Sequence, residues 1–118
     1  MKKANVITIP YAIPSRNTLD KLHWSKKKAQ REIYEYWIVK EMVDNKIPKA
    51  FDTDRYRLHF ESVKRYPVKD YDNLMGGIKL MLDALVRQRF VFDDTMKYIG
   101  TPSIKQISLT EFRRGGVY

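Results

Sequence analysis

Apolar side chains in the first half of the chain follow two spacings, one typical of strands and one typical of helices. Residues 6–9 are a short β-branched run followed by a proline, which predicts a strand. Residues 11–22 show no clear period and predict a loop. Residues 25–45 predict a long amphipathic helix, because apolar side chains recur at every fourth position: Ala29, Ile33 and Trp37, flanked by Tyr34, Ile38 and Met42.

The second half of the chain repeats this change of spacing. Residues 56–66 alternate in a strand-like way up to a proline, and residues 72–88 carry one apolar stripe at helical spacing. Residues 97–101 and 104–112 predict two more strands joined around Pro102 and Ser103, and residues 113–116 predict a frayed tail. The expected order is strand, helix, strand, helix, strand, strand.

These elements fit within one core. A chain of 118 residues is too short for two independent cores, and no repeat, low-complexity segment or linker divides it. We therefore expect a single compact α/β (α+β) domain over residues 1–118. Its small mixed sheet should have about four strands packed with two main helices.

The charge balance adds a partner class to this fold. Lys and Arg total 23 against 14 Asp and Glu, which gives a net charge of +9 at pH 7 and a pI near 9.8. Such a balance favours a polyanion, with nucleic acid as the leading candidate, although a basic surface can also serve solubility alone. The lack of cysteine excludes disulfides, zinc–thiolate sites and thiol catalysis. No apolar run has the length of a membrane span or a secretory signal, so we expect a cytoplasmic protein.

Acidic residues gather where the second predicted strand gives way to the second predicted helix. Asp70 and Asp72 are two positions apart, so both point to one side if the chain is extended there, and Asn73 follows them. Paired carboxylates suit a hard cation such as Mg²⁺. The alternative is structural: Asp72 could cap the helix and Asp70 could form a turn.

Two further polar groups extend this acidic segment. Lys79 and Asp83, seven and eleven positions after Asp72, share its face of an ideal helix at about 100° per residue. They could equally form a plain surface ion pair with each other. Asp93 and Asp94 are adjacent acids at an element boundary, where a polar turn is the ordinary explanation.

The motif formed by Asp70-x-Asp72-Asn73-Leu74, Lys79-x-x-x-Asp83-Ala84-Leu85 and Asp93-Asp94 resembles the RusA-type Holliday-junction resolvases of bacteria and their phages. The start of the chain, with Pro10, Pro14 and Asn17, also looks like the start of that family. Leu109-Thr110-Glu111 resembles part of its closing hairpin. The resemblance spans most of the chain.

The resemblance implies an α/β homodimer that binds Mg²⁺ or Mn²⁺ and makes paired incisions in a four-way DNA junction. By motif position, Asp70, Asp72 and Asp94 correspond to the metal-binding and catalytic acids, with Asp93 beside them, and Lys79 corresponds to the catalytic lysine. Here Leu74 and the lysine are separated by more residues than in shorter members. A kink at Gly76-Gly77 would change where Lys79 points.

Two basic clusters complete the expected DNA surface. One opens the first helix and the other leads to the acidic segment, and their functional interpretation is phosphate binding rather than a merely solvated face: Lys26, Lys27, Lys28 and Arg31, then Lys64, Arg65 and Lys69. Two other functions are compatible with these residues. One is a non-catalytic nucleic-acid-binding module, and the other is a nuclease that acts on other branched DNA or on RNA.

Overall fold

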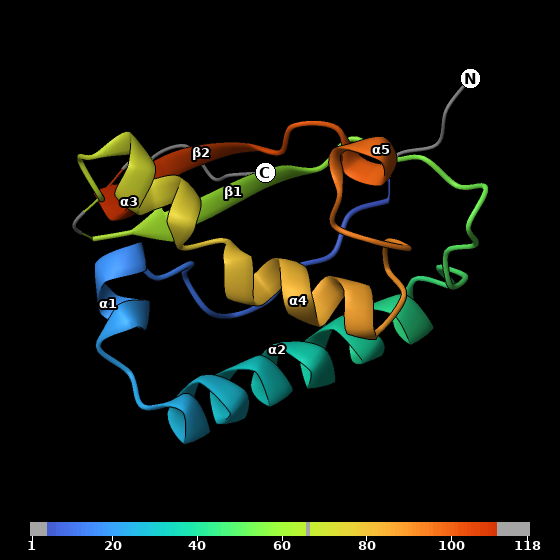
Figure 1. Ribbon diagram of the computed structural model, residues 1–118, viewed down its shortest axis with the longest axis horizontal. Coiled ribbons are helices and arrows are strands. Elements are labelled where there is room, and N and C mark those ends of the chain that lie inside the picture. Colours follow the sequence, from blue (N-terminus) through green and yellow to red (C-terminus); the bar gives the residue numbers. More distant parts are fainter. Residues whose placement is uncertain (1–4, 66, 111–118) are drawn as a thin grey trace.

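The computed structural model describes residues 5–65 and 67–110, and Figure 1 shows their arrangement. Within these ranges no helix is both long and apolar enough to cross a membrane. The elements follow in the order α1 (Arg16–Asp20), α2 (Trp24–Asp44), β1 (His59–Lys64), α3 (Tyr71–Gly76), α4 (Lys79–Arg87), α5 (Met96–Ile99) and β2 (Ser103–Ser108). Figure 1 shows α4 lying between α2 on one side and the two strands on the other.

The core forms chiefly where α2 packs against α4. Helix α2 carries two sets of apolar side chains, each with a spacing of four residues. The set with Tyr34, Ile38 and Met42 is buried, whereas Ile33 of the other set remains 40% exposed. Ala84 of α4 is fully buried, so its small side chain lets the two helices approach closely. The other buried members of the core cluster come from α4, from the residue before β1, from the segment after α4 and from α5: Met81, Leu85, Leu58, Val91 and Ile99.

β1 and β2 form a parallel pair, in register from His59 opposite Ser103 to Lys64 opposite Ser108. Parallel strands need a long crossover, and here α3, α4 and α5 supply it. A compact domain of mixed helices and strands is thus confirmed, whereas a sheet of about four strands is not, because the described residues contain two paired strands.

The two missing strands have local causes. Within residues 6–9, the N–H of Thr8 donates a hydrogen bond of 2.7 Å to Oε1 of Glu41 in α2 instead of to a neighbouring strand. Residues 96–99 wind into α5, which ends at Gly100 with a positive φ of 62°, so no hairpin joins them to β2. The predicted strand 104–112 is confirmed as far as Ser108, where β2 ends, but it is wrong for Leu109 and Thr110, which are helical. Residues 111–112 and the predicted tail 113–116 lie outside the described residues.

The helix predicted over residues 72–88 is interrupted at Gly77 and Ile78, which separate α3 from α4. The backbone of Pro14 runs directly against this point. A Cβ atom added to Gly77 would lie 1.8 Å from the carbonyl oxygen of Pro14, which no side chain can tolerate. A Cβ at Gly76 would lie 2.6–2.9 Å from the Cβ, Cγ and Cδ atoms of Arg16, so that side chain would have to shift. Gly77 is therefore what allows residues 14–16 to pack on the crossover.

Candidate functional site

Asp70 and Asp72 sit at the start of α3 in different roles. Asp70 is the N-cap: it is extended, and its Oδ2 accepts a hydrogen bond of 3.3 Å from the backbone N–H of Asn73. The capping role that the sequence suggested for Asp72 thus belongs to Asp70. Asp72 lies in the first turn with an exposed side chain, and the described residues give it no hydrogen bond or ion pair. An acid there is also favoured by the helix dipole.

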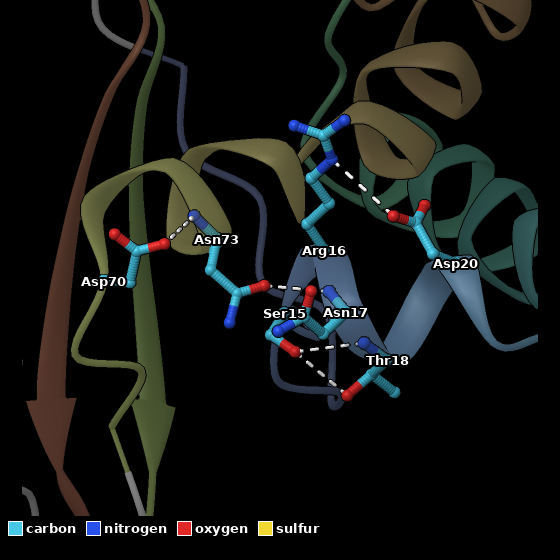
Figure 2. Close-up of polar contacts among 7 residues, drawn as sticks. All are labelled: Ser15, Arg16, Asn17, Thr18, Asp20, Asp70 and Asn73. Atoms are coloured by element: carbon cyan, nitrogen blue, oxygen red, sulfur yellow. Dashed lines mark hydrogen bonds and ion pairs between the residues drawn. The ribbon is translucent and has the colours of Figure 1, made fainter.

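Asn73 joins α3 to the N-terminal segment (Figure 2). Its Oδ1 accepts a hydrogen bond of 2.8 Å from the backbone N–H of Asn17, in α1. The side-chain Oγ of Ser15 caps α1 by accepting a hydrogen bond of 3.1 Å from the backbone N–H of Thr18. The polar residues around Asp70 therefore hold α1 against α3, and the carboxamide of Asn73 is occupied in that contact.

Lys79 and Asp83 lie one turn apart in α4. The side chain of Lys79 is exposed and that of Asp83 is half-buried, and among the described residues no ion pair links them. The simple surface ion pair that the spacing allowed is therefore wrong for this arrangement. Both charged groups are left free to meet a ligand.

Asp83 instead faces a surface hollow together with Asp94. The hollow has a volume of about 290 Å³ and lies along α2, α4 and the segment before α5. Its lining combines two acidic side chains, Asp83 and Asp94, with two basic ones, Arg31 and Arg87, around the apolar Val86. Asp93 takes a different part, because its Oδ1 accepts a hydrogen bond of 2.8 Å from the N–H of Asp94. Asp93 thus forms the local turn, and Asp94 is the acid that reaches the hollow.

Glu35 organises the basic side of this hollow. Its carboxylate accepts hydrogen bonds from Gln88 at 2.6 Å and from Arg31 at 3.0 Å, and the Nε of Arg87 lies 3.6 Å away. Burial would raise the pKa of Glu35, but these hydrogen bonds and the charges of both arginines outweigh it and lower the pKa. The Glu35 side chain is only 14% exposed, so a charged glutamate fixes both guanidinium groups beside the hollow.

Sequence reasoning missed Glu35. Its spacing of four residues from Arg31 was a usable signal for an ion pair on a helix. Its contacts with Arg87 and Gln88 could not be found that way, because they join two helices that are distant in sequence.

The predicted acids do not all come together. Figure 1 shows α3 at the start of α4 and residues 88–95 at its other end, and a nine-residue helix spans about 14 Å. Asp70 and Asp72 are thus separated from Asp94. Across the residues the structure describes, no group of three or more Asp, Glu or His side chains is arranged to hold a metal ion. Their assignment to a metal stays a prediction.

The predicted basic residues fall at the ends of elements. Lys26, Lys27 and Lys28 occupy the first turns of α2, which His23 caps by accepting from the N–H of Ser25. Lys64 ends β1, where burial lowers the pKa of its amine. Arg65 and Lys69 follow with exposed side chains. Figure 1 shows the start of α2, the end of β1 and α3 at the same end of the molecule.

No family model, no curated protein and no solved structure matches this chain. The resemblance to the RusA-type resolvases therefore rests on the sequence motif.

Proposed function

We propose that this protein is a metal-dependent endonuclease that acts on branched DNA, with the four-way Holliday junction as its substrate. The observation that supports this most directly is the hollow whose lining includes Asp83, Asp94, Arg31 and Arg87. Carboxylates beside guanidinium groups provide both halves of a phosphodiester site: oxygen ligands for a cation and donors for phosphate. The net charge of +9 and the sequence motif point to the same substrate class.

The donor chemistry of this hollow fits Mg²⁺ or Mn²⁺. Mg²⁺ is commonly bound by one or two carboxylates, with waters and substrate phosphate completing its shell, so Asp83 and Asp94 are a sufficient protein contribution. The ion would supply an activated water and stabilise negative charge on the phosphate. Arg31 and Arg87, held by Glu35, would bind the phosphate oxygens and position the scissile bond.

Asp70, Asp72 and Lys79 enter the proposal through the motif. Asp72 and Lys79 have side chains open to solvent and no partner among the described residues, so both are available to DNA or to a cation. As the resemblance implies, we assign Asp72 and Lys79 to the cleavage reaction together with Asp70; because these residues lie away from Asp94, they would contact the DNA beside the hollow instead of binding the ion within it. A homodimer would present two such sets of residues to the two strands of a junction.

The basic clusters are proposed to bind the DNA backbone. The residues Lys26, Lys27, Lys28, Lys64, Arg65 and Lys69 lie at the same end of the molecule as α3. Backbone contacts of this kind fix the position of the duplex without reading its sequence. Binding should therefore weaken steeply as the salt concentration rises.

A second candidate function is a nucleic-acid-binding module without catalysis. It is favoured by the capping bond of Asp70 and the turn bond of Asp93, because both acids perform ordinary structural roles. This candidate predicts junction binding that is indifferent to Mg²⁺ and yields no cleaved product.

The deciding experiment incubates end-labelled four-way junction, flap and linear duplex with the protein, with and without Mg²⁺ or Mn²⁺. We expect symmetric nicks in the junction that require the metal and disappear in Asp94→Asn and Asp72→Asn, while binding measured without metal is kept. Asp52→Asn removes an exposed carboxylate elsewhere and is the matched control. Metal-independent binding without nicks in any substrate would overturn the nuclease and support the binding module. Nicks in flaps alone would show that the protein is a nuclease whose substrate is the flap and not the four-way junction.

A further inference from the structure

A second hollow lies where α2 ends, and its chemistry differs from that of the first. It has a volume of about 200 Å³ and shares no lining residue with the hollow that contains Asp83 and Asp94. We call it the α2-end pocket. Its lining is mostly apolar, with one lysine and one glutamine: Val39, Met42, Val43, Ile47, Lys49 and Gln88.

The way in which α2 ends builds one wall of this pocket. The backbone N–H of Lys46 donates to the carbonyl of Val43 at 3.2 Å, and the N–H of Ile47 donates to the carbonyl of Met42 at 2.8 Å. This pair of bonds is a Schellman motif, which reverses the chain and brings the residue after the turn back against the helix. Ile47 is placed in the pocket wall by this reversal.

The lining is already fixed before a ligand binds. The N–H of Ala50 donates to the carbonyl of Arg89 at 2.7 Å, which joins the segment after α2 to the end of α4. On the α4 side, the side chain of Gln88 is held by its hydrogen bond to Glu35. A pocket with such a fixed lining loses little conformational entropy when it is filled.

The size of the pocket indicates a single apolar side chain as its occupant. Pockets for small molecules and cofactors usually have about 300–1,000 Å³, which is more than this one offers. Protein interfaces, in contrast, often centre on one or a few side chains seated in small pockets. Val43 is 70% exposed and Val39 is 42% exposed, so a seated side chain would cover apolar surface that now faces water.

The charges around the pocket specify the rest of the ligand. Lys49 belongs to the lining, and Lys46 directly precedes Ile47; both side chains are exposed, and neither amine has a hydrogen bond or ion pair within the described ranges. Lys40 and Asp44, in the last turns of α2, pair with each other at 2.7 Å and add no net charge. The pocket therefore complements an acidic segment.

Lys46 also has a backbone conformation that favours glycine. Its φ is 55°, and the residue at this place in a Schellman motif is most often glycine, which adopts such angles without strain. Lysine is thus less favourable for folding here than glycine would be. A binding role for its amine would account for a lysine at this position.

We propose that the α2-end pocket binds an acidic segment of a partner protein, with one apolar side chain of that segment in the pocket and its carboxylates on Lys46 and Lys49. DNA suits this surface less well, because phosphates would contact the two amines and leave the apolar lining uncovered. The proposal goes beyond nuclease activity and does not depend on it, because it uses none of the residues assigned to cleavage.

Fluorescence anisotropy with a labelled model peptide measures this binding on the 118-residue chain without metal. The peptide has four acidic residues followed by a leucine, and a matched peptide has serine in place of the leucine. We expect the leucine peptide to bind about tenfold or more tightly than the serine peptide, because burial of one leucine side chain is worth that factor. Equal binding of the two peptides, or no binding of the leucine peptide, would overturn the proposal.

Two pairs of variants test the location. Val43→Asp should weaken binding of the leucine peptide about tenfold or more, whereas Val6→Asp makes the same change at a valine of similar exposure and should have no effect. Lys49→Glu should also weaken binding, and Lys105→Glu reverses an exposed lysine of β2 as its control. Circular dichroism verifies that all four variants are folded. Controls as weak as their test variants would reject this pocket as the site.

Lys46→Gly separates binding from stability. Glycine relieves the left-handed backbone, so the melting temperature should rise, while loss of the amine should weaken binding of the leucine peptide about two- to fivefold. A residue with a structural role alone would not show these opposite changes. Unchanged or tighter binding by Lys46→Gly would contradict the proposed contact.

Amide chemical shifts measured by NMR distinguish the other possible occupants. The leucine peptide should shift the amides of Val39, Val43 and Ile47 and leave those of Asp83 and Asp94 unchanged. Shifts confined to the two aspartates would place the peptide in the other hollow and overturn the proposal. The same pocket shifts with a short oligothymidine would assign the pocket to nucleic acid. Peptide binding that weakens as the protein concentration rises would assign it to a second copy of the chain, and either result would reject an acidic partner.

Discussion

Gln88, the C-cap of α4, donates a hydrogen bond of 2.6 Å to Glu35 of α2, 53 positions earlier in the chain. The same carboxylate receives Arg31 from its own helix and lies near Arg87 from α4. Glu35 thus links the two helices that build the core through polar contacts. Its position links the stability of the fold to the placement of the two arginines beside the hollow.

Glu35→Gln should destabilise the protein by about 1–3 kcal/mol, because it removes the charge that two hydrogen bonds and two guanidinium groups stabilise. Urea unfolding followed by circular dichroism measures this change. Glu61→Gln is the control, since Glu61 pairs with His59 on an exposed surface and its loss should change stability by less than about 1 kcal/mol. Equal effects of the two substitutions would contradict the role of Glu35.

The lowered pKa of Glu35 also predicts a pH dependence of stability. The folded chain holds this carboxylate below its ordinary pKa of 4.5, so the unfolded chain binds the proton more readily. Its stabilising contribution is complete above pH 4.5 and is lost as the pH falls through the lower folded value. The melting temperature of the wild type should therefore fall more steeply than that of Glu35→Gln in this acidic range. Parallel curves would show that Glu35 titrates normally.

Gly77→Ala should destabilise the fold by about 1–3 kcal/mol or more, because its methyl group would overlap the carbonyl oxygen of Pro14 and push residues 14–16 away. Gly76→Ala is the matched control in the neighbouring position. Its methyl group would crowd the Cβ, Cγ and Cδ atoms of Arg16 but no backbone atom, and alanine favours a helix over glycine, so its destabilisation should be smaller than that of Gly77→Ala. Thermal melts of both variants give the comparison.

Asp70 can be tested separately as a cap and as a charge. Asp70→Ala should cost about 1 kcal/mol of stability through loss of the capping bond to Asn73, whereas Asp70→Asn keeps an equivalent cap. If Asp70 also takes part in cleavage, Asp70→Asn should melt like the wild type and yet fail to cut a junction. Full cleavage by Asp70→Asn would reduce this residue to a helix cap.

Ser62 is the one polar residue that is buried within the described part of the chain, at 3% exposure. Its Oγ accepts a hydrogen bond of 3.1 Å from the N–H of Ile13, which joins the N-terminal segment to β1. Ser62→Ala should leave that N–H without a partner and cost about 1–3 kcal/mol. Amide hydrogen exchange should also show faster exchange at Ile13, and unchanged exchange there would contradict this contact.

The sequence predicted the longest element best. Helix α2, over Trp24–Asp44, differs by one residue at each end from the prediction of 25–45, because a regular pattern over five turns outweighs local exceptions. Residues 97–101 were wrong as a strand, since a β-type composition over five positions is too short to exclude a helical turn. There the N–H of Tyr56 binds the carbonyl of Tyr98, a distant contact that no local pattern contains.

The candidate site shows the same limit. The acids were visible as a motif, but which of them meet depends on the length and direction of α4. Asp94 reaches the hollow with Asp83, while Asp70 and Asp72 lie at the other end of that helix. Local chemistry could therefore nominate each residue, whereas tertiary packing decides how they are grouped.

The parallel pairing of β1 with β2 sets an order of events for folding. β1 cannot find its neighbour until residues 65–102 have been synthesised and placed, because its partner strand follows the entire crossover. We expect α2 and α4 to associate first during synthesis, because both helices are complete before β2 emerges, and the sheet to be completed last. During that interval the edges of β1 are unpaired, and the nascent chain is then most exposed to aggregation.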